Sequence, residues 1–149
     1  MPEPEAGTAA DAGTDLALLR EAAAEAGRIA MRYFRQKPEV WLKDGTSPVS
    51  EADYAADRYL RETLLSARPD YGWLSEETVE NTLHSAGLRG FIVDPIDGTR
   101  GFLDDNPQWC VSVAVVENGR PLAGVLECPA TGETFAALHG GGATLNGEP

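Results

Sequence analysis

The segment FIVDPIDGTRGF, residues 91–102, places two aspartates around a proline directly behind an apolar run. Asp94 and Asp97 stand three positions apart, and carboxylates this close repel each other unless a cation or a proton lies between them. The proline removes a sheet hydrogen bond, so a turn there can aim both side chains at one point. Gly98 permits a tight backbone, and Thr99 adds a hydroxyl. Carboxylates for Mg²⁺ beside free N–H groups for a phosphate are the parts that phosphoryl transfer needs.

Two other short segments carry acids beside turn-forming residues: SEAD contains Asp53, and WLSEE contains Glu76 and Glu77. Each acid also has a structural explanation. Asp53 can simply cap a helix, Glu76 and Glu77 can lie in a solvated loop, and acids around a proline are common in turns. The individual residues leave both explanations open, and it is the joint occurrence of three acidic segments that favours a metal site.

Other acidic or glycine-rich motifs fail on spacing. An aspartyl-phosphate phosphatase of the haloacid dehalogenase kind needs aspartates two positions apart, whereas Asp94 and Asp97 are three apart. An EF-hand loop ending at Gly98 would need acids where Val93 and Pro95 stand. The glycine-rich GGGATLNG does not match the GxxxxGK[ST] pattern of a phosphate-binding P-loop.

Two helices are expected to position the acids. Residues 1–13 are acidic and rich in proline, alanine and glycine, and we expect a flexible tail there. From Thr14 as N-cap, apolar residues spaced by three and four predict an amphipathic helix that ends before the next proline. Ser50 and Asp53 stand in capping-box spacing and predict the start of a second helix, after a turn at 44–45.

Beyond these helices the hydrophobic period changes to two. Residues 90–97 predict a short buried strand that ends at Val93. Residues 109–138 predict three strands joined by turns, the first turn lying at 117–120, and the final HGGGATLNGEP is expected to be a glycine-rich loop. Two helices followed by an antiparallel meander make residues 14–149 one α+β unit.

Composition and charge limit the classes of partner that the protein can bind. The 149 residues carry a formal charge of −12, which argues against a nucleic-acid polymer or an anionic membrane, because basic patches bind phosphate backbones. A small phosphorylated metabolite is still compatible if metal ions mediate. No apolar run approaches about 18 residues, and the start shows no signal pattern. Cys110 and Cys128 lack CxxC spacing, so we expect reduced core cysteines and a cytoplasmic protein.

In this order, KDGTSPVSEAD, WLSEE and VDPIDGT resemble the inositol monophosphatase superfamily of Mg²⁺-dependent phosphomonoesterases. That superfamily includes the 3′(2′),5′-bisphosphate nucleotidases and a branch of histidinol phosphatases. The resemblance runs from about Leu16 to Pro149, and GGGATLNGEP fits the family's mid-chain glycine loop. It implies the first half of a layered αβαβα fold, in which two N-terminal helices pack on an antiparallel sheet, and a homodimer at full length.

Carried over residue by residue, the resemblance implies a metal site with four ligands: Glu76, Asp94, Asp97 and the main-chain carbonyl of Ile96. By the same resemblance Asp53 and Thr99, with Glu76, make the catalytic group that positions and deprotonates a water. Gly98 and Thr99 offer N–H groups to the phosphate, Glu77 supports the ligands, and Lys43 matches a basic position near them. The implied cofactor is two or three Mg²⁺ ions, for which Mn²⁺ can substitute.

The substrate is left open by the residues. Arg100 directly follows the DPIDGT motif and can contact a second phosphate or a carboxylate, or point into solvent. The segments resemble most closely the bisphosphate nucleotidase branch, with inositol 1-phosphate and histidinol phosphate as alternatives. The family also draws a metal-binding aspartate from a Trp-Asp-x-Ala segment in its second half, and none of Trp41, Trp73 and Trp109 precedes an aspartate. A truncated protein that only binds or assembles is therefore the non-enzymatic alternative.

Overall fold

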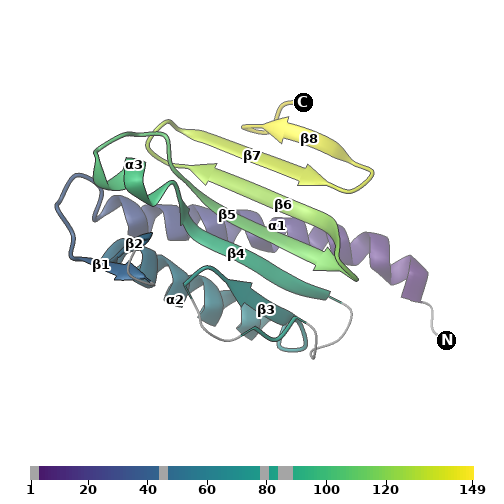
Figure 1. The fold of residues 1–149 in the computed structure, drawn as a ribbon. Helices are drawn as coiled ribbons and strands as arrows, with labels where there is room; N and C mark the ends of the chain where they lie inside the picture. Colours follow the sequence, from purple (N-terminus) through teal and green to yellow (C-terminus); the bar gives the residue numbers. More distant parts are fainter. Residues whose placement is uncertain (1–3, 44–46, 78–80, 84–88) are drawn as a thin grey trace.

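Two helices lie on one face of a six-stranded sheet, and a two-stranded arm and a short helix stand at one end of it (Figure 1). This computed structural model describes residues 4–43, 47–77, 81–83 and 89–149. The α+β class expected from the sequence is confirmed. None of the described helices is long and apolar enough to span a membrane. The elements in chain order are α1 (Pro4–Met31), β1 (Val40–Lys43), β2 (Ser47–Ser50), α2 (Glu51–Ala67), β3 (Gly72–Ser75), β4 (Arg89–Asp97), α3 (Thr99–Leu103), β5 (Cys110–Glu117), β6 (Arg120–Cys128), β7 (Glu133–Leu138) and β8 (Gly142–Leu145).

The first helix begins at Pro4, so the predicted start at Thr14 is wrong. Its backbone includes residues 4–13, for which the sequence predicts a flexible tail. Two local preferences explain the earlier start: alanine is the strongest helix former, and a proline is tolerated in the first turn because its missing N–H has no intrahelical partner there.

The buried face of α1 is made mostly of alanine, which lets the helix lie close to β5, β6 and β7. Gly27 stands at the closest approach. A Cβ atom there would lie 3.2 Å from Cγ of Glu127 and 3.3 Å from Cγ of Pro129, at the end of β6. The glycine that weakens the helix by propensity is thus favoured by its close packing.

The second helix begins as the sequence predicts. Ser50 is the N-cap, and its side chain accepts hydrogen bonds from the N–H groups of Ala52 and Asp53 at 3.1 Å and 3.4 Å. In return, Oδ2 of Asp53 accepts the N–H of Ser50 at 2.8 Å, which completes the capping box. One face of α2 packs against α1 and β4 through Leu60, Leu64 and two alanines.

The sheet has the strand order β3-β4-β5-β6-β7-β8, and the predicted meander is confirmed from β4 to β7. Two features differ from the prediction. β3 pairs parallel to β4, so the sheet is mixed rather than antiparallel. The expected glycine-rich loop contains β8, which pairs with β7 because a turn with Gly140 and Gly142 at positive φ returns the chain to the exposed edge. The turn expected at 44–45 lies outside the described residues.

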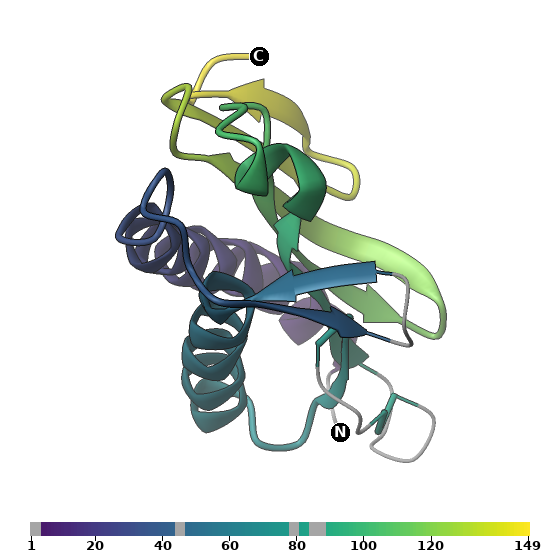
Figure 2. The same ribbon diagram turned by 60° about the vertical axis from the view of Figure 1, so that its left-hand side comes forward.

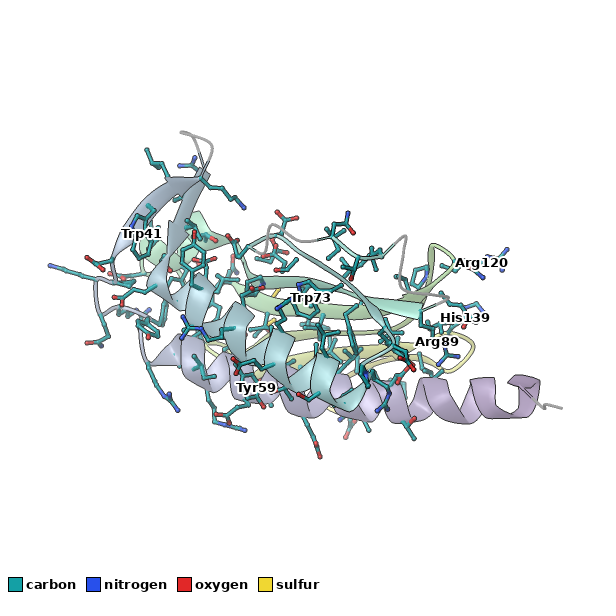
Figure 3. All side chains as sticks on the ribbon, turned by 90° about the horizontal axis from the view of Figure 1, so that it is seen from below. Trp41, Tyr59, Trp73, Arg89, Arg120 and His139 are labelled. Carbon is teal, nitrogen blue, oxygen red and sulfur yellow. The ribbon has the colours of Figure 1, made fainter. Side chains whose placement is uncertain are left out.

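Two buried clusters hold these layers together. The larger one lies between the helices and the sheet and includes Trp73, whose place between α2 and the sheet is seen in Figure 3. The smaller one contains Phe34, Phe102 and Trp109, whose ring centroids are 4.9–5.5 Å apart. Ile96 of β4 belongs to this aromatic cluster. The aromatic cluster therefore fixes the end of α1, the end of β4 and α3 to one another.

A buried ion cluster joins α1, α2 and the sheet at the end far from the arm (Figure 3). Asp15 is fully buried, with Oδ1 2.8 Å from Nε of Arg68 and Oδ2 3.2 Å from Nη1 of Arg89. Tyr71 donates its hydroxyl to Oδ2 of Asp15 at 2.7 Å. Nε of Arg89 also contacts Glu117 at 2.9 Å. Buried charges are tolerated only when paired in this way.

We expect Asp15→Asn to lower the free energy of unfolding by about 3–5 kcal/mol, because two arginines would lose the carboxylate that neutralises them. Urea unfolding followed by circular dichroism measures the loss. Glu25→Gln is the control, since its partner Arg28 is 66% exposed, and an exposed pair of this kind contributes under about 1 kcal/mol. Equal small losses in both variants would contradict a structural role for the cluster.

The sheet face away from α1 and α2 is apolar and is not covered by any described element (Figure 2). Large side chains on this face are 38–41% exposed: Ile92, Leu126, Phe135 and Leu145. Between them runs a row of small paired residues, Ala114, Gly124, Ala137 and Ala143. They line a hollow of about 310 Å³. Small residues flanked by large apolar ones form a surface into which another element can pack.

Candidate functional site

The predicted site residues meet at one end of the sheet, where β3 and β4 end, α2 and α3 begin and the β1–β2 arm lies (Figure 1). A cavity of about 320 Å³ lies there, lined by Lys43, Pro48, Glu76, Glu77, Asp94, Ile96, Gly98, Thr99 and Arg100. Two predicted residues do not line it. Asp53 is fully buried beside Thr99, and Asp97 lines a neighbouring cavity of about 340 Å³ with Gly98 and Trp109.

A bulge in β4 brings the two aspartates together. The predicted strand end at Val93 is wrong, because β4 continues to Asp97. Asp94 pairs with Ser112 and Asp97 with Cys110, so one extra residue is inserted in β4 between these pairs. In a regular strand, residues three apart point to opposite faces, and one extra residue reverses that relation. As a result, Asp97 is the strongest of the charges acting on Asp94.

The carbonyl of Ile96 and the glycine turn follow the bulge. Gly98 has φ of 95°, a left-handed conformation that favours glycine, and it starts α3. The side chain of Ile96 is buried in the aromatic cluster, which turns its carbonyl away from that cluster and towards Thr99. The Thr99 hydroxyl lies 3.1 Å from this carbonyl oxygen. A carbonyl has two lone pairs, so it retains one for another partner.

Asp53 and Thr99 form the buried pair of the site. The hydroxyl of Thr99 donates to Oδ1 of Asp53 at 3.0 Å, although the two residues are 46 positions apart. The other carboxylate oxygen of Asp53 is occupied by Ser50. Burial raises the pKa of Asp53, and its hydrogen bonds from Ser50 and Thr99 oppose that rise. Asp53 thus caps its helix and orients Thr99 at the same time.

Glu76 and Glu77 lie in a turn held by Lys43 of the arm. Nζ of Lys43 donates to the main-chain carbonyl of Glu76 at 3.0 Å and lies 3.6 Å from Oε1 of Glu77. The Glu76 side chain is 63% exposed, whereas that of Glu77 is only 5% exposed. Burial and the charge of Asp53 raise the pKa of Glu77, and Lys43 lowers it. Glu76 is therefore the acid of the pair that can turn towards a ligand in the cavity.

The carboxylates make a strongly negative site. Partial burial, followed by the charges of Asp97, Glu76, Glu77 and Asp53, raises the pKa of Asp94 to about 7. A cation between these groups would offset both the cost of burial and the repulsion between the carboxylates, because it favours the charged form of each acid. Hard oxygen ligands of this kind suit Mg²⁺ or Mn²⁺.

The chain's own atoms fit such a cation. Oε1 of Glu77 is buried without a hydrogen-bond partner in the described part of the chain, and its ion-pair partner, Nζ of Lys43, lies 3.6 Å away, so this oxygen can still accept a hydrogen bond from a group such as a metal-bound water. Within residues 4–43, 47–77, 81–83 and 89–149, no three His, Cys, Asp or Glu side chains already converge on one point. Glu76 and Asp97 are both exposed, so their side chains can rotate to bring their carboxylates to the same cation as Asp94.

The raised pKa of Asp94 predicts a pH dependence for the metal-free chain. Between about pH 4 and pH 7 the folded state holds a proton that the unfolded state has released, so stability falls as the pH rises through this range. Asp94→Asn should lack this part of the slope. Thermal unfolding in a chelator at pH 5 and pH 7.5, for both proteins, measures the difference. Parallel pH profiles would show that Asp94 titrates normally.

Sequence reasoning missed two residues that the structure places behind the acids. Asp57 lies one turn after Asp53 in α2 and is 7% exposed, and Ser75 at the end of β3 is 5% exposed. Ser75 donates its hydroxyl to Oδ1 of Asp57. The i,i+4 spacing of the two aspartates was a usable signal, since it places both on one helix face. Ser75 carried none, because its contact spans 18 residues of sequence.

The chain is similar to known proteins both in sequence and in structure. A histidinol-phosphatase from Chlorobaculum parvum is 39% identical over 136 residues, which cover 91% of this chain and 52% of that protein. An inositol-1-monophosphatase from Rhizobium meliloti is 41% identical over 133 residues, covering 88% and 50%. The solved structure of the extragenic suppressor protein suhB from Bartonella henselae superposes with a TM-score of 0.84 at 36% identity, covering 91% and 53%. The chain thus spans about half the length of the curated relatives it matches.

The family model described as the inositol monophosphatase family matches residues 12–149. This match includes every residue of the site and all of the sheet. The chain therefore belongs to the inositol monophosphatase family.

Proposed function

We propose that this chain supplies the metal- and phosphate-binding part of a metal-dependent phosphomonoesterase. The observation that carries the proposal is the group of carboxylates around Asp94, whose pKa is raised to about 7, next to the hydrogen-bonded Asp53 and Thr99. A cluster of acids that only a cation or protons can stabilise, beside a hydroxyl held by a buried carboxylate, suits hydrolysis of a phosphate ester.

Each residue has a role in this proposal. Glu76, Asp94, Asp97 and the Ile96 carbonyl would hold two or three Mg²⁺ ions, for which Mn²⁺ can substitute, and such ions would supply Lewis-acid stabilisation of the phosphoryl oxygens and of the attacking water. The Thr99 hydroxyl, oriented by Asp53, would accept a proton from that water while it gives its own proton to the Asp53 carboxylate. The N–H groups of Gly98 and Thr99 at the start of α3 bind the phosphate oxygens.

The substrate we propose is a small phosphorylated metabolite with a second anionic group, as in a 3′(2′),5′-bisphosphate nucleotide. Arg100 and Lys43 both line the cavity, so two cations lie near the carboxylate cluster. In a fusion of this chain with the second half of the Rhizobium meliloti relative, Arg100→Gln should then raise the KM for a bisphosphate and leave the KM for inositol 1-phosphate unchanged. Equal changes for the two substrates would remove Arg100 from substrate recognition.

Histidinol phosphate is the second candidate substrate. It is favoured by the 39% identity to a protein described as a histidinol-phosphatase. Its amine is cationic, so Arg100 would oppose it and Arg100→Gln would improve its KM. The direction of that change separates the two candidates. We place the reaction in the cytoplasm, consistent with the free thiols of Cys110 and Cys128.

We further propose that a second polypeptide segment completes the active site. The resemblance draws one metal-binding aspartate from the second half of the family fold, and the apolar sheet face offers a surface for that half. Where that half is absent, a second copy of this chain can cover the same face. We propose a homodimer for the full-length protein separately from this face. Metal bound by these 149 residues alone would lack one anionic ligand, and hydrolysis by two metals needs both in place.

The test compares the 149-residue chain with a fusion in which it precedes the second half of the Rhizobium meliloti relative. We expect the chain alone to bind Mn²⁺ but to release negligible phosphate from inositol 1-phosphate, histidinol phosphate or a 3′,5′-bisphosphate at millimolar Mg²⁺. The fusion should hydrolyse at least one of them. Light scattering should show the chain alone as an oligomer. An efficient monomeric chain would contradict the need for a second segment, and a chain that binds no metal would contradict the function itself.

A further inference from the structure

The helix that carries Asp53 also carries a second buried acid, Asp57, on the same face. Asp53 contacts Thr99 on one side of the cavity. Asp57, one turn further along, contacts Ser75 at the end of β3, on the side where Glu76 and Glu77 follow. One rigid helix thus reaches both sides of the proposed metal site.

Ser75 passes the contact on to the acidic turn. Its hydroxyl donates to Oδ1 of Asp57, and the same oxygen accepts the N–H of Glu77 at 3.1 Å. A serine hydroxyl has one proton, so the bond to Asp57 uses that proton and leaves a lone pair of Ser75 to accept the N–H of Glu77. The N–H of Glu76 is held separately, by the carbonyl of Val93 at 3.1 Å.

The Glu76–Glu77 turn, which directly follows β3, is therefore held both by the sheet and by α2. The bond from Glu76 to Val93 ties the turn to β4, one residue before Asp94. The chain of bonds through Ser75 ties it to α2. The side chains of Asp57 and Ser75 are almost fully buried, so water competes little for these hydrogen bonds.

We infer that Asp57 and Ser75 are positioning residues that hold the Glu76–Glu77 turn against α2, so that the Glu76 carboxylate reaches the same cation as Asp94. This inference rests on the proposed function, because it assumes that Glu76 binds metal. Groups that orient the ligands of a metal commonly change its affinity by 10–100-fold when they are removed.

The test is Mn²⁺ binding by the 149-residue chain, measured from the signal of free Mn²⁺ in electron paramagnetic resonance. Ser75→Ala and Asp57→Ala should each weaken binding by about tenfold. The double variant should be no weaker than either single one, because both changes break the same chain of bonds. Asp57→Asn should restore most of the affinity, since its amide oxygen can still accept the Ser75 hydroxyl.

Asp15→Asn is the matched control. It also removes a buried carboxylate, but Asp15 belongs to α1 and contacts Arg68, at the end of α2 far from the cavity. It should lower the melting temperature and leave Mn²⁺ affinity unchanged, which separates positioning from general loss of stability. Wild-type affinity in Ser75→Ala overturns the inference alone. Absence of Mn²⁺ binding in the wild-type chain overturns the proposed function together with it, so the two failures are distinguishable.

Discussion

Replacing Asp94 with asparagine should abolish measurable binding of Mg²⁺ and Mn²⁺, with a loss of affinity of more than about 100-fold. Asp94 stands at the centre of the cluster, since the charges of Asp97, Glu76, Glu77 and Asp53 all act on it. Removal of groups that merely orient ligands already lowers affinity by up to about 100-fold, so the loss of an anionic ligand should exceed that. Calorimetric titration of the metal into both proteins measures the difference.

The same variant should be at least as stable as the wild-type chain in a chelator, because one of several repelling charges is gone. Asp70→Asn provides the control for charge: it makes the same chemical change at an exposed residue beyond the end of α2. It should bind metal as the wild type does. Asp97→Asn should resemble Asp94→Asn. Equal metal affinity in Asp94→Asn and the wild type would show that these carboxylates serve only the turn.

The second large effect is expected from Asp53→Asn, measured as turnover of the fusion with the relative's second half. Asparagine caps a helix about as well as aspartate, so the start of α2 should persist with little change in melting temperature. It cannot take a proton from the water that Thr99 orients, so turnover should fall by about 10²-fold or more.

Glu51→Gln is the matched control for Asp53→Asn. Glu51 lies in the same first turn of α2 and accepts the N–H of Glu39 at 3.1 Å, outside the cavity. Loss of its charge should leave turnover unchanged. If Asp53→Asn retained both full stability and full turnover, Asp53 would be a helix cap and nothing more.

The parts of the fold that are amphipathic could be read from the sequence. The α2 helix, its capping box at Ser50 and the β4–β7 meander follow directly from hydrophobic period and turn residues. The parallel partner β3 could not, because a four-residue strand shows no period and its direction is decided by the chain that connects it to β4. The start of α1 at Pro4 was missed because Thr14 is a strong cap candidate within an alanine-rich helix.

In the site, too, some features could be predicted from the sequence and others could not. Sequence neighbours were enough to propose Asp53, Asp94 and Asp97 as site residues, because the proline, glycine and serine beside them are typical of turns and helix caps. The bulge that brings Asp94 and Asp97 together depends on pairing with β5, which the sequence of β4 does not contain. The contact between Asp57 and Ser75 depends on how β3 lies against α2, and only the assembled core determines that.

The placement of α1 against β5, β6 and β7 has a consequence for the order in which the chain is made. About 100 residues separate the end of α1 at Met31 from the end of β6 at Cys128. At roughly 5–20 residues per second on the ribosome, the helix waits about 5–20 seconds for the strands that bury it. An alanine-rich face exposes little apolar area per residue during that wait, whereas leucines would expose far more. The composition of α1 thus suits a helix that is synthesised well before the strands that complete its burial.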